Sequence, residues 1–212
     1  MEATLTKSDL PKESVGKPVS RRPSIQKRRK AMPKNDNVKS IRLYESVKNN
    51  VSEEAADSIA EKVYLAKSAD FKRKFKWAND VCNYLKINFD DEQIKKIRMS
   101  CSCTPPPKYI EAVKKLYQAS ESLDEFCQKY NTTYEGKHSV WYDGDVLFFS
   151  YPSCYCDCVK RVDGQVPTTW CLCTLGYTKK LFDTVLDYNT EVELIESIKT
   201  GGIRCIMKIT RK

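Results

Sequence analysis

The amino-acid sequence predicts an α+β fold, in which a helical N-terminal half is followed by an antiparallel β-sheet crossed by one helix. From residue 38 to about residue 131, apolar residues recur every three or four positions, which is the spacing of one buried face of an α-helix. After Asn131 apolar and polar residues alternate, as they do in half-buried strands, and Asp-Gly and Gly-Gly pairs mark tight turns. Helices followed by strands in this way are typical of α+β proteins.

Residues that favour helix N-termini divide the first half into separate helices. The first apolar stripe covers residues 38–51, with Val38, Ile41 and Val47 on one face. The stretch C-S-C-T-P-P-P at residues 101–107 is predicted to be a loop, because its prolines end one helix and begin the next. The residues predicted to cap the remaining helices are Ser52, Ser68 or Asp70, Asp90 and Ser120.

The second half contains two predicted hairpins with a helix between them. S-V-W-Y-D-G-D-V-L-F-F-S-Y indicates two short strands joined at Asp143-Gly144. V-E-L-I-E-S-I and I-R-C-I-M-K-I indicate two more, joined at Gly201-Gly202. Between the hairpins, W-C-L-C-T-L-G leads into apolar residues with helical spacing, and this segment is the helix expected to cross the sheet.

The positive charge of the chain is concentrated near its N-terminus. The net charge is +9, and residues 1–42 contribute +8 of it, with twelve Lys or Arg and four Asp or Glu. Residues 1–35 are rich in Pro, Ser and Lys and lack aromatic residues, so we expect a disordered basic tail there and one cysteine-rich domain over residues 36–212. The basic run at residues 21–30 is expected to be a solvated tail, and the alternative is a weak contact with nucleic acid or an anionic surface through this run alone.

The sequence also indicates the compartment of the protein. No apolar run is long enough to span a membrane, and the first 30 residues contain no apolar secretory segment. We therefore expect a cytoplasmic protein whose cysteines are reduced. In a reducing compartment, grouped cysteines indicate metal binding or catalysis rather than a disulfide framework.

The cysteines carry the most functional information. Seven of the ten lie in C-x-C groups, and residues two apart in an extended segment point to the same face, so each group can direct its sulfurs to one point. Thiolates are soft ligands that bind Zn²⁺ and iron–sulfur clusters strongly. The predicted metal ligands from this pattern are Cys101, Cys103, Cys154, Cys156, Cys158, Cys171 and Cys173.

We expect these groups to converge on one site. Only a turn around Asp163-Gly164 separates the second and third groups, and the prolines after the first group give its loop the stiffness that a fixed ligand geometry needs. Cys82 and Cys127 stand alone in helical stripes and are expected to be buried core residues, because a single buried cysteine behaves as a small hydrophobe.

Other residues carry weaker functional signals. His138 is the only histidine; it precedes a strand in a polar loop, so a surface position is expected, although a histidine beside a cysteine nucleophile would fit a hydrolase or a transferase. Neither a dinucleotide-binding nor a P-loop glycine motif is present. Most aromatic residues near the cysteines are expected in the core and some along a ligand cavity: Trp141, Tyr142, Phe148, Phe149, Tyr151, Tyr155 and Trp170.

Residues 170–209 carry a resemblance to a known family. W-C-L-C-T-L-G-Y-T-K-K-L-F followed by V-E-L-I-E-S-I-K-T-G-G-I-R-C-I-M-K-I resembles the end of the 4-vinyl-reductase-like domain family, whose members bind small effectors, often aromatic hydrocarbons, beside a cysteine-ligated zinc in several cases. The whole chain is also similar to a group of uncharacterised cysteine-rich prokaryotic proteins with the same C-x-C blocks, which implies no activity.

The family resemblance implies particular site residues. Cys173 (or Cys171) and Cys205 would be metal ligands, and Gly176 and Tyr177 would open the helix beside the pocket. The chain departs from the family pattern at one place, since Ser197 stands where a second hairpin cysteine is usual. The C-x-C groups, or a carboxylate of Glu193 or Glu196, would then complete the ligand set.

Together these features predict a thiolate metal-binding domain, with zinc as the cofactor, that binds or senses a small molecule or uses the metal structurally. Seven grouped thiols exceed the four ligands of one closed zinc site, which leaves room for a second ion, an iron–sulfur cluster or an open catalytic position. The alternative is therefore a cysteine- or metal-dependent enzyme, either a hydrolase or an iron–sulfur redox protein. A DNA-associated regulator ranks last, because no helix-turn-helix pattern accompanies the basic tail.

Overall fold

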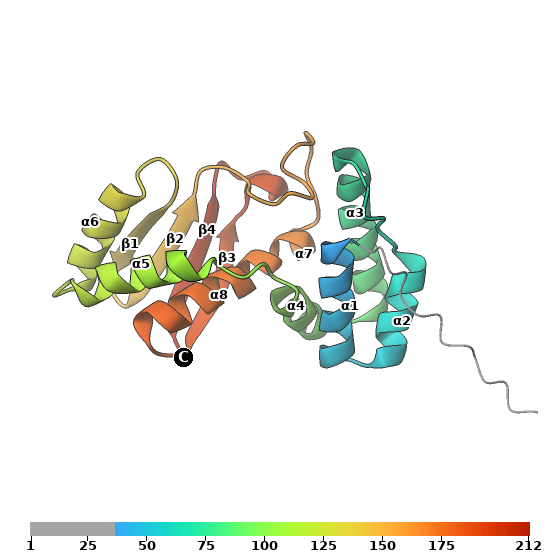
Figure 1. Cartoon of the computed structure of the whole chain (residues 1–212), viewed down its shortest axis with the longest axis horizontal. Helices are drawn as coiled ribbons and strands as arrows, with labels where there is room; N and C mark the ends of the chain where they lie inside the picture. The colour runs from blue at the N-terminus through green and yellow to red at the C-terminus, as the bar shows by residue number, and fades with distance from the viewer. Residues whose placement is uncertain (1–36) are drawn as a thin grey trace, which may run out of the picture. The chain divides into compact units, whose positions relative to one another are not determined.

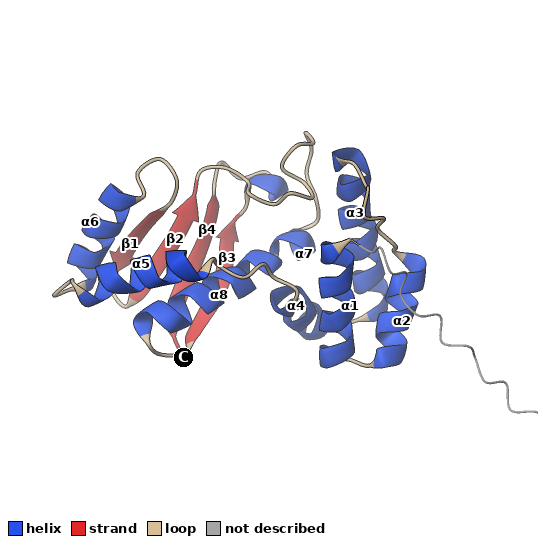
Figure 2. Ribbon diagram, viewed as in Figure 1, coloured by secondary structure: helices blue, strands red, loops and turns tan. Residues whose placement is uncertain are grey.

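The computed structural model describes residues 37–212, and the predicted basic tail with its polyanion contacts lies outside them. Within this range the first half is helical and the second half holds the sheet, so the predicted α+β class is confirmed (Figure 1). No helix of the described residues is long and apolar enough to cross a membrane. The elements, coloured by type in Figure 2, are α1 (Val38–Asn50), α2 (Glu53–Lys62), α3 (Phe71–Asn88), α4 (Asp91–Ser100), α5 (Pro107–Gln118), α6 (Leu123–Thr133), β1 (Ser139–Asp143), β2 (Val146–Tyr151), α7 (Thr168–Cys171), α8 (Cys173–Leu186), β3 (Thr190–Glu196), a 3₁₀ turn (Ile198–Thr200) and β4 (Cys205–Arg211).

Short polar side chains begin the helices, mostly where the sequence predicts. Ser52, Asp70 and Asp90 each accept a hydrogen bond from a backbone N–H group at the start of α2, α3 and α4. The cap of α6 differs from the prediction, because Ser122 takes this role while the Ser120 hydroxyl donates to a carbonyl at the end of α5. The helical boundaries of the first half therefore follow from capping chemistry.

The buried face of α1 begins later than the sequence predicts. Leu43 and Val47 are buried, whereas Val38 and Ile41 are exposed. The reason is that α1 packs on α2 and α4, and these neighbours cover its residues from Leu43 onward rather than its first turn. Helical spacing locates a stripe, but the length of the stripe that is covered depends on the neighbouring helices.

The four strands form one antiparallel sheet with the order β1-β2-β4-β3. The two hairpins join because β2 pairs with β4, and this register sets Phe149 opposite Met207 and Tyr151 opposite Cys205. Since side chains two apart share a face of a strand, these four side chains lie on the same face of the sheet. Phe149 and Met207 belong to the core, and Tyr151 and Cys205 lie on the same face at the end of the β2–β4 pair.

The apolar core has two parts that meet at the C-terminal end of α4. One part lies between the sheet and helices α5, α6 and α8. The other is built from α1 to α4 with α7, and in it Trp77 and Trp170 meet edge to face at 5.4 Å. Helix α4 packs against α1, α7 and α8 and so contacts both parts (Figure 1). Cys101 and Cys171 pack against the helical part and Cys205 belongs to the sheet part, so the cysteines lie at this junction.

Gly176 allows α8 to approach the end of α4 closely. A Cβ atom at this position would lie 2.8 Å from the Met99 carbonyl carbon and from Ser102 Oγ, and nearer still to the Met99 carbonyl oxygen. Because the obstacle is backbone, we expect Gly176→Ala to lower the free energy of unfolding by about 1–3 kcal/mol, measured by urea denaturation. Thr184→Ala, at an exposed position of the same helix, should change it by less than about 0.5 kcal/mol. Equal stability of the two variants would contradict this close packing.

Candidate functional site

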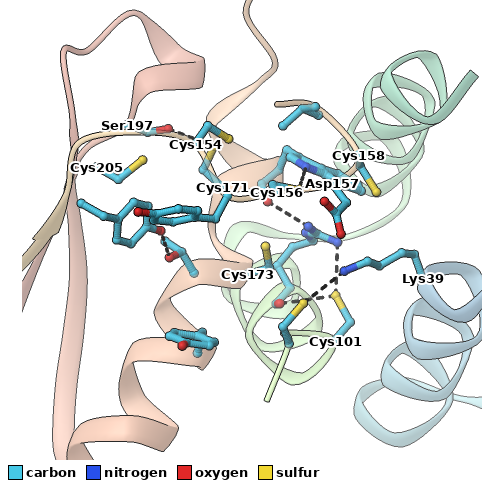
Figure 3. Close-up of a pocket in the computed structure, with 18 of the residues that line it drawn as sticks. Lys39, Cys101, Cys154, Cys156, Asp157, Cys158, Cys171, Cys173, Ser197 and Cys205 are labelled. Atoms are coloured by element: carbon cyan, nitrogen blue, oxygen red, sulfur yellow. Dashed lines mark hydrogen bonds between the residues drawn. The ribbon is translucent and has the colours of Figure 1, made fainter. Parts of the chain in front are cut away.

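Eight of the ten cysteines line the same cavity, whose volume is about 290 Å³. The cavity lies where the two parts of the core meet (Figure 3). Cys82 and Cys127 are buried in the core away from this cavity, as the sequence predicts. The eight that line it are those proposed from the sequence as metal ligands: Cys101, Cys103, Cys154, Cys156, Cys158, Cys171, Cys173 and Cys205.

Four segments far apart in the sequence bring these cysteines together. The C-S-C group follows α4, the C-Y-C-D-C group lies in the loop after β2, and the C-L-C group spans the break between α7 and α8. Cys205 is the first residue of β4. The C-x-C groups therefore lie in loops and at helix ends rather than in strands, where side-chain direction is set by the local turn instead of a pleat.

Basic side chains bond two of the cavity thiols, Cys101 and Cys103, and interact electrostatically with three more. Arg98 in α4, Lys39 and Arg42 in α1 supply the positive charges, and Figure 3 draws Lys39 pointing into the cavity beside Cys101. We call these five residues the basic thiol group: Cys101, Cys103, Cys156, Cys158 and Cys173.

Arg98 is a buried cation that bonds a cavity sulfur and backbone carbonyls. It is only 3% exposed, and its guanidinium donates to Cys101 Sγ at 3.1 Å and to the Trp170 carbonyl at 2.8 Å. The same guanidinium lies 4.3 Å from the centre of the Trp170 ring. No ion pair among residues 37–212 includes Arg98. Burial lowers the pKa of Arg98, but the neighbouring thiols, Cys101 foremost, outweigh it and the net pKa is raised.

The exposed Cys103 is held by two cations from α1. Lys39 Nζ donates to Cys103 Sγ at 3.1 Å, and Arg42 donates to the same sulfur at 3.5 Å. Partial burial lowers the pKa of Lys39, yet the hydrogen bond to Cys103 leaves it raised overall. Cys103 is therefore the cavity cysteine with two basic side chains on its sulfur.

Cys156 and Cys158 form a hydrogen-bonded thiol pair. The hydrogen bond from Cys158 lowers the pKa of Cys156 against the opposing effect of burial, and the Trp170 indole N–H, 3.4 Å from Cys156 Sγ, adds to it. The same hydrogen bond, with burial, raises the pKa of Cys158. The pair therefore loses one proton readily and retains the other.

The remaining three cavity thiols, Cys154, Cys171 and Cys205, lie on the side of the cavity toward Ser197 and the start of β4, and we call them the sheet-side thiol group (Figure 3). Ser197 Oγ donates to Cys171 Sγ at 3.1 Å and also bonds Cys205. Burial raises the pKa of Cys171 to about 12, and it raises that of Cys205 as well. The serine that replaces the expected cysteine of the resembling family therefore contacts two of these thiols.

A second buried cation lies near the sheet-side thiol group. Lys199 is 8% exposed, and its ammonium donates to the Val162 carbonyl at 2.6 Å. Burial raises the pKa of Cys154, while the charge of Lys199 acts to lower it. Each of the two thiol groups thus has its own buried cation, Arg98 or Lys199.

Aromatic rings form the other end of the cavity. His138 is half-buried and lines it, which corrects the expected surface position. The correction follows from its surroundings, because the rings of Phe149 and Tyr155 each lie 5.6 Å from the imidazole, and the Tyr109 hydroxyl lies 3.5 Å from its Nδ1 atom. The aromatic residues that line this end, besides His138, are Phe149, Tyr151, Tyr155 and Tyr177.

A protein-family model matches residues 32–212, which is most of the chain. The chain belongs to the DUF6144 family. This family is described as one of unknown function. A comparison with curated proteins finds no match.

Two solved structures illustrate what the fold of this DUF6144 chain is similar to. An H-NOX domain from Shewanella oneidensis in the Fe(II)CO ligation state is 11% identical, with a TM-score of 0.38 over 84% of this chain and 98% of that one. An H-NOX protein from S. oneidensis in the Fe(II)NO ligation state is 12% identical, with a TM-score of 0.37 over 82% and 98%. The similarity is too low to say what this chain binds.

The sequence analysis did not identify three basic residues that lie in or near the DUF6144 site. Arg98 lies three residues before Cys101, and this spacing on a helix places the arginine over the sulfur, so i, i+3 geometry was the available signal. Lys39 reaches the cavity from α1, and Lys199, in the 3₁₀ turn, bonds the Val162 carbonyl outside the cavity lining. No local pattern connects either lysine to a cysteine more than 40 residues away, so only the tertiary structure could reveal them.

The half-buried histidine makes stability depend on pH. Burial, followed by the charge of Lys137, lowers the pKa of His138 below 6.5. Between the folded and unfolded pKa values the unfolded chain binds more protons, so the free energy of unfolding falls as the pH falls from 6.5 through the folded pKa. We expect this slope to be smaller in His138→Gln, measured by urea denaturation between pH 8 and 5. Parallel pH profiles for the two proteins would contradict the burial of His138.

Proposed function

We propose that this chain is a thiolate metal-binding domain that holds zinc and binds a small apolar molecule in the same cavity. The observation that carries the proposal is that eight cysteines and several aromatic rings line the same cavity. Among the described residues no three His, Cys, Asp or Glu side chains are already arranged as metal ligands, so binding requires the thiols to turn about their side-chain bonds.

The sheet-side thiol group fits an open zinc site. Zinc takes thiolate ligands, and sites that bind a further molecule use three protein ligands and leave one position free. Cys154, Cys171 and Cys205 are three such donors, and the hydrogen bonds of Ser197 to two of them would orient the sulfurs. Zinc bound there would supply a Lewis-acid position facing the cavity. This arrangement also accounts for the missing hairpin cysteine, because Cys154 provides the third sulfur.

The aromatic end of the cavity fits a small planar molecule. An apolar cavity of about 150 Å³ holds benzene, so about 290 Å³ is enough for a one-ring compound with substituents. Phe149 and Tyr151 come from β2, which continues into the loop carrying Cys154, so a molecule against these rings would lie beside the sheet-side thiol group. The Tyr151 hydroxyl bonds Cys205 and Thr174, which fixes this ring at the boundary between the two ends.

Metal content is the first test. We expect the full-length chain, purified without oxygen, to contain zinc by elemental analysis and to be colourless, because zinc has a filled d shell. Cys171→Ser/Cys205→Ser should lower the zinc content, and Cys127→Ser, a core cysteine outside the cavity, should not. Visible charge-transfer bands would instead indicate an iron–sulfur cluster. Zinc content unaffected by the cavity variant would overturn the proposal.

Toluene serves as the probe for the apolar end. We expect calorimetric titration to detect toluene binding to the zinc-loaded chain, and Tyr155→Ala to weaken it several-fold, because this half-exposed ring lines the cavity. Ile203→Ala removes an apolar side chain that is 86% exposed and lies elsewhere, and it should leave toluene affinity unchanged. Equal affinities for the two variants would remove the small-molecule part of the proposal.

A further inference from the structure

We infer that the cavity holds two metal centres and that the basic thiol group forms the second, a closed four-sulfur zinc centre whose charge is balanced by Arg98 and Lys39. The inference rests on the proposed function, since it divides the same thiols between two ions. The four ligands are Cys101, Cys156, Cys158 and Cys173.

The number and grouping of the thiols support two ions. A closed zinc site takes four ligands, and the cavity has eight cysteines, which is more than one ion uses. Their contacts divide them as well. The hydrogen-bond partners of Cys101 and Cys103 are side chains of α1 and α4, whereas Cys171 and Cys205 bond Ser197 beside the sheet. Figure 3 draws Cys205 and Ser197 at one side of the cavity and Cys101 and Lys39 at the other.

The burial of Arg98 requires a compensating negative charge. A guanidinium that is 3% exposed and has no carboxylate in an ion pair is costly to bury unless another anion faces it. Its guanidinium bonds Cys101 Sγ, one of the proposed ligands. A thiolate ligand at this position would therefore place its negative charge directly against Arg98.

The cations that line the cavity match the negative charge of a four-thiolate zinc centre. One Zn²⁺ replacing the protons of four thiols releases four protons and leaves a complex of charge −2. Arg98 and Lys39, the Arg and Lys residues that line the cavity among residues 37–212, supply +2 beside it, and Arg42, outside the lining, adds a positive charge at Cys103. The one carboxylate that lines the cavity, Asp157, is exposed and paired with Lys160 at 2.6 Å, so it adds no net charge.

The four proposed ligands are less exposed to solvent than Cys103. Cys158 is buried and Cys101, Cys156 and Cys173 are half-buried, whereas Cys103 is exposed and held by Lys39 and Arg42. A closed centre excludes water, which favours the four covered thiols. Trp170, which bonds Cys156 through its indole and Arg98 through its carbonyl, would hold the ligand and the counter-charge in place.

Zinc stoichiometry tests the inference in the full-length chain. We expect two zinc ions per chain in the wild type, one in Cys101→Ser/Cys173→Ser and one in Cys171→Ser/Cys205→Ser, with Cys127→Ser as the matched control that keeps two. One ion per chain, lost in both double variants, would overturn the two-centre inference and leave the proposed function standing. The absence of zinc from the wild type would overturn both.

A second measurement needs no variant and so does not depend on variant folding. The wild-type chain is titrated with zinc and then treated with iodoacetamide, and mass spectrometry counts the alkylated cysteines at each ratio. We expect Cys101 and Cys173 to become protected in a step separate from Cys171 and Cys205, while Cys103 remains alkylated at two equivalents. Protection of all these cysteines in one step at one equivalent would overturn the inference.

Discussion

Replacing Arg98 with methionine is expected to lower the free energy of unfolding by roughly 3–5 kcal/mol, because the substitution leaves two buried carbonyls and a sulfur without their donor. The guanidinium bonds Cys101 Sγ and the carbonyls of Thr169 and Trp170, and methionine keeps its volume but makes none of these bonds. For a domain of this size each kcal/mol corresponds to about 2–4 °C of melting temperature, so the loss should approach 10 °C or more.

Two further variants serve as comparisons for Arg98→Met. Arg98→Lys keeps the charge but loses the fork of donors, and we expect an intermediate loss. Arg204→Met removes an exposed arginine and should change the free energy of unfolding by less than about 0.5 kcal/mol. The measurement is urea denaturation with a metal chelator present, so that metal content does not enter. If Arg98→Met matches Arg204→Met in stability, the hydrogen bonds of the guanidinium do not stabilise the packing of α4 on α7.

The fold could be predicted largely because its signals are local. The Asp143-Gly144 pair lies between two alternating runs, and the structure has β1 and β2 on either side of it. Ser52 and Asp90 cap helices because the chemistry of an N-cap involves residues only three positions apart. Ser120 failed as a cap for a related reason. A serine can bond backward as well as forward, and here the carbonyl of Leu116 was the available partner.

The cysteines of the candidate site and part of its aromatic lining could be predicted. C-x-C spacing indicated which cysteines belong together, and these line one cavity, as do Phe149, Tyr151 and Tyr155 among the aromatic residues named from the sequence. Its charged components depend on contacts across the fold, such as that between Lys39 and Cys103, 64 residues apart. His138 was misplaced because a polar loop sequence gives no sign of the rings of Phe149 and Tyr155 that enclose it.

Removing the metal is expected to have the second large effect. A ligand present at about 1,000 times its dissociation constant stabilises the folded state by about 4 kcal/mol, and zinc loading of the cavity should follow this rule at each centre. Burial raises the pKa values of Cys171 and Cys173 to about 12, so these thiols are protonated near neutral pH and must release protons to bind zinc. Zinc affinity, and with it the stabilisation, should therefore increase between pH 6 and 8.

Calorimetric melting of the full-length chain, with and without a zinc chelator, measures this difference. We expect the chelator to lower the melting temperature by about 8–16 °C for each centre emptied, at about 2–4 °C per kcal/mol. Cys82→Ala is the matched control. It removes a fully buried sulfur outside the cavity, so it should lower the melting temperature of both forms while the difference between them stays the same. A melting temperature that does not respond to the chelator, in a chain shown to contain zinc, would mean that the metal does not join α4, α8 and the sheet.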